Sequence, residues 1–193
     1  MRVALIAVCV AAVGLIAGLG SSLNAEGAKA RSASAEQIAR GKYLVLLGGC
    51  ADCHSPKVMS PNGPIPDPMR AFSGHPESAK LPAIPGGVLG PDKWGAMTTM
   101  DLTAWVGPWG VSFTANLTPD PATGIGGWTE EMWLKTFKTG KHLGEGRPIL
   151  PPMPIQPLGL LKEQDLKDMY AYFMSLKPIR NAVPQPIPPA GDH

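Results

Sequence analysis

The sequence has few aromatic residues, few cysteines and no concentration of charge. Aromatic residues make up 6% of its 193 positions, and the formal net charge is only +2. It contains no basic block or basic stripe, which argues against nucleic-acid binding. Glycine and proline are abundant instead, with 23 and 22 residues. This length and composition predict one domain with long loops, in which a buried cofactor would supply much of the missing apolar volume.

A long apolar run occurs only at the N-terminus, from Val3 to Gly20. Arg2 precedes the run and small residues follow it up to Ala25, as in a cleaved export signal. The run is rather long for a signal core and barely long enough to span a bilayer, so a retained anchor in the inner membrane is the alternative. We therefore expect residues 1–25 to be a signal peptide or an N-terminal anchor, and the rest of the chain to be periplasmic.

Cysteine is scarce outside this run. Cys9 lies inside it, which leaves Cys50 and Cys53 in the exported part. Together with His54 they form C-x-x-C-H, the pattern of covalent haem attachment. The two-residue gap lets two thiols reach the two vinyl groups on one edge of the porphyrin and form thioethers. His54 is then held under the iron as an axial ligand. We expect one covalent haem c.

Two other interpretations of the cysteine pair stay open, a redox disulfide and half of a zinc site. A zinc site needs two further ligands, and the remaining histidines are His75, His142 and His193. A thioredoxin-like site needs a β-α-β pattern, and the sequence has no such pattern. Neither interpretation explains why a histidine directly follows the second cysteine.

A methionine is the expected sixth iron ligand, because a His and Met axial pair raises the reduction potential. Met153 lies in the segment Pro-Pro-Met-Pro at 151–154, where prolines prevent a helix and keep the backbone extended and stiff. The competing methionines are Met59, Met69, Met97 and Met100. An open or water-bound sixth site is the other alternative, and it would indicate a haem enzyme or a gas-binding sensor.

Helical periodicity is confined to three segments, expected as helices over roughly 35–48, 130–139 and 161–176. Ser34 and Thr129 are the expected N-caps of the first two helices, and Gly140 is the expected C-cap of the second. Prolines interrupt every candidate element between about 56 and 110. We predict a long ordered insertion of loops and short turns there, of a length that is usually functional.

The attachment motif followed by Met153 resembles the class I cytochrome c family over residues 34–180. Within that range, Phe-Thr-Ala-Asn-Leu-Thr-Pro-Asp at 113–120 and Thr-Gly-Ile-Gly-Gly-Trp-Thr at 123–129 are similar to the haem c subunits of bacterial membrane-linked dehydrogenases. Those subunits accept electrons from alcohol, aldehyde, gluconate or N-heterocycle oxidation. The resemblance implies an all-α, cytochrome c-like fold. The long Pro/Gly-rich loop insertion at about 56–110 is beyond the minimal family domain, and residues 181–193 form a Pro-rich tail.

The family fold also implies that the first and last helices cross, with Gly41 letting Tyr43 approach Tyr170 and Phe173. Lys162 occupies the place where a Ser or Thr normally caps the last helix, so we expect a poorer start to that helix. Related subunits often carry three C-x-x-C-H motifs, whereas this chain has one. The chain therefore resembles a single-haem relative.

The function implied by the resemblance is transfer of single electrons without catalysis. The donor would be a periplasmic or membrane-bound dehydrogenase, and the electrons would go on to the respiratory chain. Candidate haem contacts are Arg147, as the partner of a haem propionate, and Asn116 and Trp128, as hydrogen-bonding groups near the haem edge. Each of the three also fits an ordinary structural contact of a loop.

Overall fold

The structure is a computed structural model that describes residues 33–189. The predicted export signal or anchor, Cys9, His193 and the end of the tail lie outside the described residues. Among the described residues, no helix is long and apolar enough to cross a bilayer. The elements in chain order are α1 (Ala35–Leu47), α2 (Cys50–His54), β1 (Lys57–Ser60), β2 (Gly63–Pro66), β3 (Met97–Thr98), β4 (Ala104–Gly107), β5 (Gly110–Phe113), α3 (Glu130–Thr139), a 3-10 turn η1 (His142–Gly144), α4 (Ile155–Gly159) and α5 (Glu163–Met174).

The predicted helix ends are confirmed at their caps. The Ser34 hydroxyl accepts a hydrogen bond from Gln37 N at 3.1 Å, and the Thr129 hydroxyl accepts one from Met132 N at 3.1 Å. Gly140 ends α3 in the left-handed conformation. Lys162 gives α5 no side-chain cap, as expected, and α5 begins after it.

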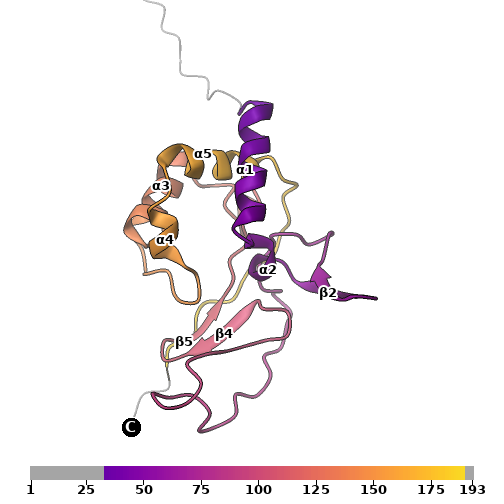
Figure 1. Ribbon diagram of the computed structural model, residues 1–193, viewed down its shortest axis with the longest axis vertical. Helices are drawn as coiled ribbons and strands as arrows, with labels where there is room; N and C mark the ends of the chain where they lie inside the picture. Colours follow the sequence, from indigo (N-terminus) through magenta and orange to yellow (C-terminus); the bar gives the residue numbers. More distant parts are fainter. Residues whose placement is uncertain (1–32, 190–193) are drawn as a thin grey trace, which may run out of the picture. The chain divides into compact units, whose positions relative to one another are not determined.

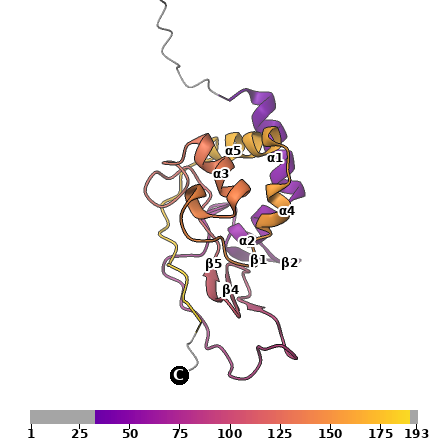
Figure 2. The same cartoon turned by 90° about the vertical axis from the view of Figure 1, so that its left-hand side faces the viewer.

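Helices α1 and α5 cross, as Figures 1 and 2 show, and Gly41 lies at the crossing. A Cβ atom at Gly41 would overlap the backbone oxygen of Asp168 and lie 2.9 Å from Cβ of Tyr172. The predicted approach of Tyr43 to this contact is wrong, because Tyr43 is 61% exposed. Residues two apart on a helix point to different faces, so Gly41 and Tyr43 cannot share one contact.

The core lies between α1, α3 and α5. Its buried aromatic side chains contact one another, and the ring centroids of Trp133 and Phe137 are 4.7 Å apart. The indole N–H of Trp133 donates to Leu166 O at 2.8 Å, so the largest core side chain is also satisfied as a donor. The buried members of this cluster, called here the helical core, are Val45, Phe72, Ile125, Trp133, Phe137, Ile155, Leu166, Met169 and Phe173.

The insertion contains short strands, which the all-α prediction lacks. β1 and β2 pair antiparallel, and β3, β4 and β5 form a second antiparallel sheet in that order. The free edge of β5 is bridged to the C-terminal segment, since Val111 and Ile187 exchange both backbone hydrogen bonds, at 2.8 and 2.9 Å. Figure 2 shows this C-terminal segment running from α5 to the sheet.

The strands were not predicted because prolines occupy the turns between them. The turn at 60–63 reads Ser-Pro-Asn-Gly and the turn at 107–110 reads Gly-Pro-Trp-Gly. In each hairpin the first and fourth residues pair, so proline occupies the second position of a four-residue turn. Proline is favoured at that position because its fixed φ fits the turn. The same residues that exclude a helix therefore direct two hairpins.

Candidate functional site

The C-x-x-C-H residues form the short helix α2 directly after α1. Gly49, with φ of 62°, turns the chain between the two helices. Cys50 and Cys53 are three residues apart on α2, so their side chains share one side of it. Both are free thiols and both are partly buried. Cys50 also packs against the helical core.

The surroundings of the two thiols do not favour thiolates. Burial is the largest influence and raises the pKa of Cys50 and the pKa of Cys53. The nearby Lys57 ammonium opposes the shift at Cys53 without reversing it. Redox-active cysteine pairs have lowered pKa values, so this environment argues against the disulfide interpretation. The zinc interpretation also lacks ligands, because residues 33–189 contain no cluster of three or more His, Cys, Asp or Glu side chains suited to a metal ion.

His54 is buried and oriented by a backbone carbonyl. Its side chain is 8% exposed, and its Nδ1 lies 2.8 Å from the oxygen of Ala115. A carbonyl oxygen can only accept, so Nδ1 carries the proton and Nε2 keeps a free lone pair. Burial lowers the pKa of His54, which favours the neutral ring that metal ligation requires.

A loop after the β1–β2 hairpin is hydrogen-bonded to the backbone of His54 and to the side chain of Ser55, the next residue. Gly74 N donates to His54 O at 2.8 Å, and Phe72 N donates to the Ser55 hydroxyl at 2.9 Å. On its other side this loop accepts a hydrogen bond from Leu117 N at Phe72 O, at 2.8 Å. The loop therefore lies between the end of the attachment helix and the segment that supplies the carbonyl of Ala115.

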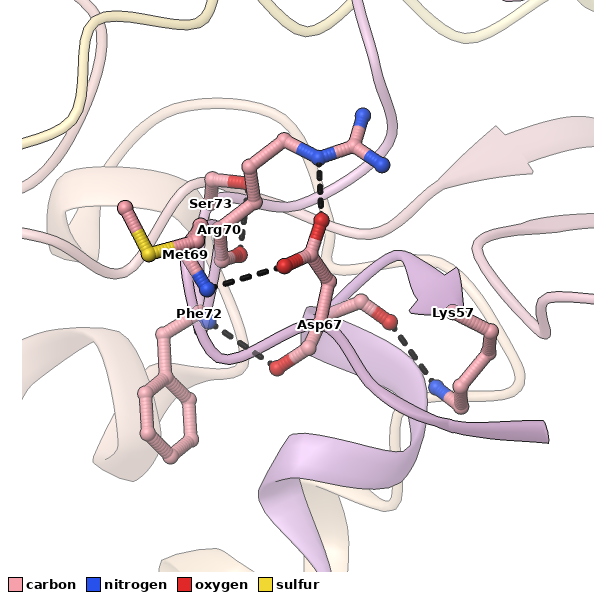
Figure 3. Close-up of polar contacts among 7 residues, drawn as sticks. Lys57, Asp67, Met69, Arg70, Phe72 and Ser73 are labelled. Carbon is pink, nitrogen blue, oxygen red and sulfur yellow. Dashed lines mark hydrogen bonds and ion pairs between the residues drawn. The ribbon is translucent and has the colours of Figure 1, made fainter. Parts of the chain in front are cut away.

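Asp67 fixes the start of this loop. Its carboxylate accepts from Met69 N at 2.8 Å and from Arg70 Nε at 2.7 Å, as drawn in Figure 3. These hydrogen bonds lower the pKa of Asp67. Phe72, two residues beyond Arg70, adopts a left-handed φ of 62° and packs edge-on against Phe173 at 5.4 Å. A bulky residue keeps that conformation only where its surroundings hold it there.

Lys57 is hydrogen-bonded to the backbone of residues 50–55, called here the attachment loop. Its ammonium donates to the backbone oxygens of Asp52 at 2.5 Å, Ser55 at 2.8 Å and Asp101 at 3.3 Å. Two of these acceptors flank His54 in the sequence, and the third belongs to the insertion. Figure 3 shows the Lys57 side chain reaching back toward the end of α2.

Met153 packs against the same helical core as Cys50 and is partly buried. Ile155, two residues later, is buried and begins α4. The competing methionines lie elsewhere. Met59, Met69 and Met100 are each at least 78% exposed, and Met97 lines a small apolar cavity beside the three-stranded sheet. The structure thus brings Cys50 and Met153 to one apolar cluster.

The three candidate haem contacts have different surroundings. Trp128 packs against the helical core, and its ring lies edge-on to His142 at 5.1 Å. Asn116 is 3% exposed and makes protein contacts, donating to Ile179 O at 2.8 Å. Arg147 is exposed and donates to the backbone of the next residue at 3.1 Å. Trp128 therefore packs against the cluster that holds Cys50 and Met153, whereas the hydrogen bonds of Asn116 and Arg147 are made to backbone oxygens elsewhere.

These donors suit a c-type haem. Two unpaired thiols, a neutral imidazole with a free Nε2 and a thioether on a stiff segment are the groups that such a haem requires. The hydrogen bond between His54 Nδ1 and the carbonyl of Ala115 is of the kind that orients metal-ligating histidines in proteins. Sequence reasoning missed Ala115 as a contact, although it lies in the 113–120 segment that carries the family resemblance.

Comparison with known proteins supports the resemblance. No family model matches the chain. The chain is 29% identical over 151 residues to a nicotinate dehydrogenase subunit of Pseudomonas putida, covering 78% of this chain and 10% of that protein. It is 28% identical over 170 residues to the alcohol dehydrogenase (quinone) cytochrome c subunit of Gluconobacter oxydans, covering 88% of this chain and 27% of that protein. It is also 28% identical over 137 residues to the gluconate 2-dehydrogenase cytochrome c subunit of Pantoea cypripedii, covering 71% of this chain and 22% of that protein.

The predicted resemblance to cytochrome c subunits of bacterial dehydrogenases is therefore confirmed, at modest identity. The chain spans between 10% and 27% of the length of these curated relatives. The substrates in their names belong to those whole proteins.

Proposed function

We propose that this chain is a single-haem electron-transfer subunit with a cytochrome c-like fold. In this proposal Cys50 and Cys53 bind one haem c through thioethers, and His54 and Met153 are its axial ligands. The haem iron supplies the chemistry, which is the uptake and release of one electron. The polypeptide binds the group, orients its ligands and limits access of water.

The observation that carries the proposal is the setting of His54. The residue that directly follows the two thiols has its Nδ1 held by Ala115 O, and its Nε2 is left free. The lowered pKa of His54 favours the ligating form of the ring. Neither a disulfide nor a structural cysteine pair requires a neighbouring histidine in this state.

The relatives named as cytochrome c subunits of dehydrogenases support an electron-transfer role and a dehydrogenase as the donor. We infer that the chain takes electrons from a periplasmic or membrane-bound dehydrogenase and passes them toward the respiratory chain. The catalytic chemistry would then take place in the partner.

The donor can be tested with the purified holoprotein. Absorption spectra are recorded before and after addition of membranes that contain the candidate dehydrogenase and its substrate. The proposal expects substrate-dependent reduction of the haem, and none when the substrate is omitted. Failure of every candidate donor system to reduce the protein would count against the electron-transfer role.

The sixth ligand is tested separately by Met153→Ala. Loss of the thioether should raise the affinity of the reduced protein for carbon monoxide and lower the reduction potential. Met59→Ala, at an exposed methionine, is the matched control and should change neither. Wild-type protein that already binds carbon monoxide fast and completely would instead favour a haem enzyme or gas sensor with an open site.

A further inference from the structure

The side chain of Ser112 forms a hydrogen bond between the β4–β5 hairpin and the Met153 segment. Its hydroxyl donates to the backbone oxygen of Pro151 at 2.6 Å. Ser112 lies on β5, is 6% exposed and precedes Pro151 by 39 residues. A buried hydroxyl from the sheet thus binds the backbone two residues before the proposed iron ligand.

The segment at 150–153 can form few other hydrogen bonds that would hold it in place. Pro151 and Pro152 have no N–H to donate. Within residues 33–189, the bond from Ser112 is the only hydrogen bond that joins this segment to a distant part of the chain. The segment is otherwise held by the packing of Met153 against the helical core and at its flanks, where Ile149 N donates to Gly140 O at 2.8 Å and Ile155 is buried.

Trp109 orients the hydroxyl of Ser112. The indole N–H donates to the Ser112 oxygen at 3.1 Å, so the hydroxyl hydrogen is free to point at Pro151. Such chains of hydrogen bonds strengthen their members. The indole itself lies against Gly107, where a Cβ atom would come within 2.5 Å of the ring carbons. The tight turn of the hairpin therefore sets the position of the donor.

The strand that carries Ser112 is fixed on both edges. Ser112 lies opposite Trp105 on β4, and the adjacent Val111 exchanges backbone hydrogen bonds with Ile187 on the other edge. A hydroxyl on a strand paired in this way has little freedom to follow a moving partner. It can act as a fixed point for the chain it binds.

We propose that Ser112, oriented by Trp109, is a positioning residue that holds the Met153 thioether for iron ligation. This inference rests on the proposed function, because it requires Met153 to be the sixth ligand. A thioether is a neutral, weak ligand, so its occupancy depends on how well its segment is held in place. The inference gives the hairpin at the end of the insertion a role in setting the haem environment.

The test uses holoprotein of four variants, each compared with the wild type. Ser112→Ala removes the donor, and Trp109→Phe removes the indole N–H. Ser112→Thr keeps a hydroxyl at the same position of the strand. Ser60→Ala is the matched control, because it removes a hydroxyl that bonds Gly63 O at 2.7 Å in the other hairpin. The readouts are the far-red charge-transfer band of thioether-ligated ferric haem and the carbon monoxide affinity of the reduced protein.

We expect Ser112→Ala to weaken the band and to raise carbon monoxide affinity about fivefold, the factor in an equilibrium constant that one ordinary hydrogen bond contributes. Trp109→Phe should have a smaller effect of the same sign, Ser112→Thr should restore the wild-type behaviour, and Ser60→Ala should match the wild type. If Ser112→Ala yields no folded holoprotein, Trp109→Phe decides in its place.

The outcomes distinguish failure of the positioning role of Ser112 from failure of the proposed iron ligation by Met153. Wild-type protein without the charge-transfer band would remove Met153 as ligand, and the positioning role with it. A normal band in the wild type that persists unchanged in Ser112→Ala and Trp109→Phe would overturn the positioning role alone. An equal effect of Ser60→Ala would also overturn it, since the change would then reflect general loosening of the protein.

Discussion

At the scale of single residues, the attachment loop depends on Lys57 as well as on its cysteines. The ammonium of Lys57 donates to three backbone oxygens, two in the loop and one at Asp101 in the insertion. Hydrogen bonds from a charged donor are stronger than neutral ones. Removing the ammonium leaves these carbonyls to find water or to go unpaired.

Lys57→Met keeps most of the unbranched side chain and removes its three donors. We expect the holoprotein to lose about 1–3 kcal/mol of unfolding free energy, the usual effect of deleting one partner of such hydrogen bonds. Urea unfolding measures the change. Lys80→Met, at an exposed lysine, is the control and should be close to neutral. Equal midpoints for the two variants would show that Lys57 does not support the loop.

His75 gives the folded protein a dependence on pH. It is 2% exposed, and its Nδ1 lies 2.8 Å from the hydroxyl of Thr103, which itself donates to Asp101 at 2.8 Å. That hydroxyl must accept from His75, so Nδ1 carries the proton of the neutral ring. Burial lowers the pKa of His75 below its ordinary value of 6.5, and the carboxylate of Asp101 opposes this shift only in part.

The unfolded chain therefore takes up a proton at His75 before the folded protein does. The unfolding free energy should be unaffected by His75 above pH 6.5 and should fall as the pH drops from there through the lowered pKa of the folded state. Urea unfolding of wild-type and His75→Gln holoprotein between about pH 7.5 and about pH 5 measures this. The variant should show the shallower dependence, and identical slopes would rule His75 out as a contributor.

At the scale of elements, the crossing of α1 and α5 requires the absence of a side chain at Gly41. Gly41→Ala should cost roughly 1–3 kcal/mol of unfolding free energy or more, because the new methyl group overlaps the backbone of Asp168. Gly86→Ala is the matched control, since a Cβ there meets nothing within 4 Å. A Gly41→Ala protein as stable as this control would mean that the helices do not cross as closely as described.

The three longer helices α1, α3 and α5 could be predicted from the sequence because their signals are local, whereas α2 and α4, of five residues each, were not predicted because they are too short to show helical periodicity. The cap residues Ser34 and Thr129 and the apolar spacing of α3 and α5 each lie within a few residues of what they determine. The strands could not be predicted in the same way, because each is at most four residues long and too short to show a clear alternating pattern. A proline in the second position of a turn also looks, in isolation, like any other interruption.

Some residues of the candidate site could likewise be predicted from the sequence, and others could not. The C-x-x-C-H residues and Met153 stand out because their residue types are rare and closely spaced. The contacts of Ala115 and Pro151 are made by backbone oxygens. Every residue carries such an oxygen, so these contacts cannot be predicted from residue type. Ser112 and Lys57 were missed for a related reason, since an isolated serine or lysine indicates no particular partner.

At the scale of the whole described chain, helices α1, α3 and α5 lie toward one end and the three-stranded sheet toward the other, with α2 between them (Figures 1 and 2). The insertion is joined to the attachment loop through Lys57 and Asp101, and its last hairpin is joined to the Met153 segment through Ser112. In our account, the insertion therefore supports both segments that would supply iron ligands to one haem, and the helical core would supply the apolar surroundings.

The most direct test of this account is the intact mass of the purified protein from a host that attaches haem to c-type cytochromes. The account predicts a coloured protein whose mass exceeds that of its polypeptide by one haem and stays so after denaturation. Cys53→Ala should mature poorly in the same host, because one thioether and the geometry at His54 are lost. A colourless wild-type protein with the mass of the bare polypeptide would contradict the account.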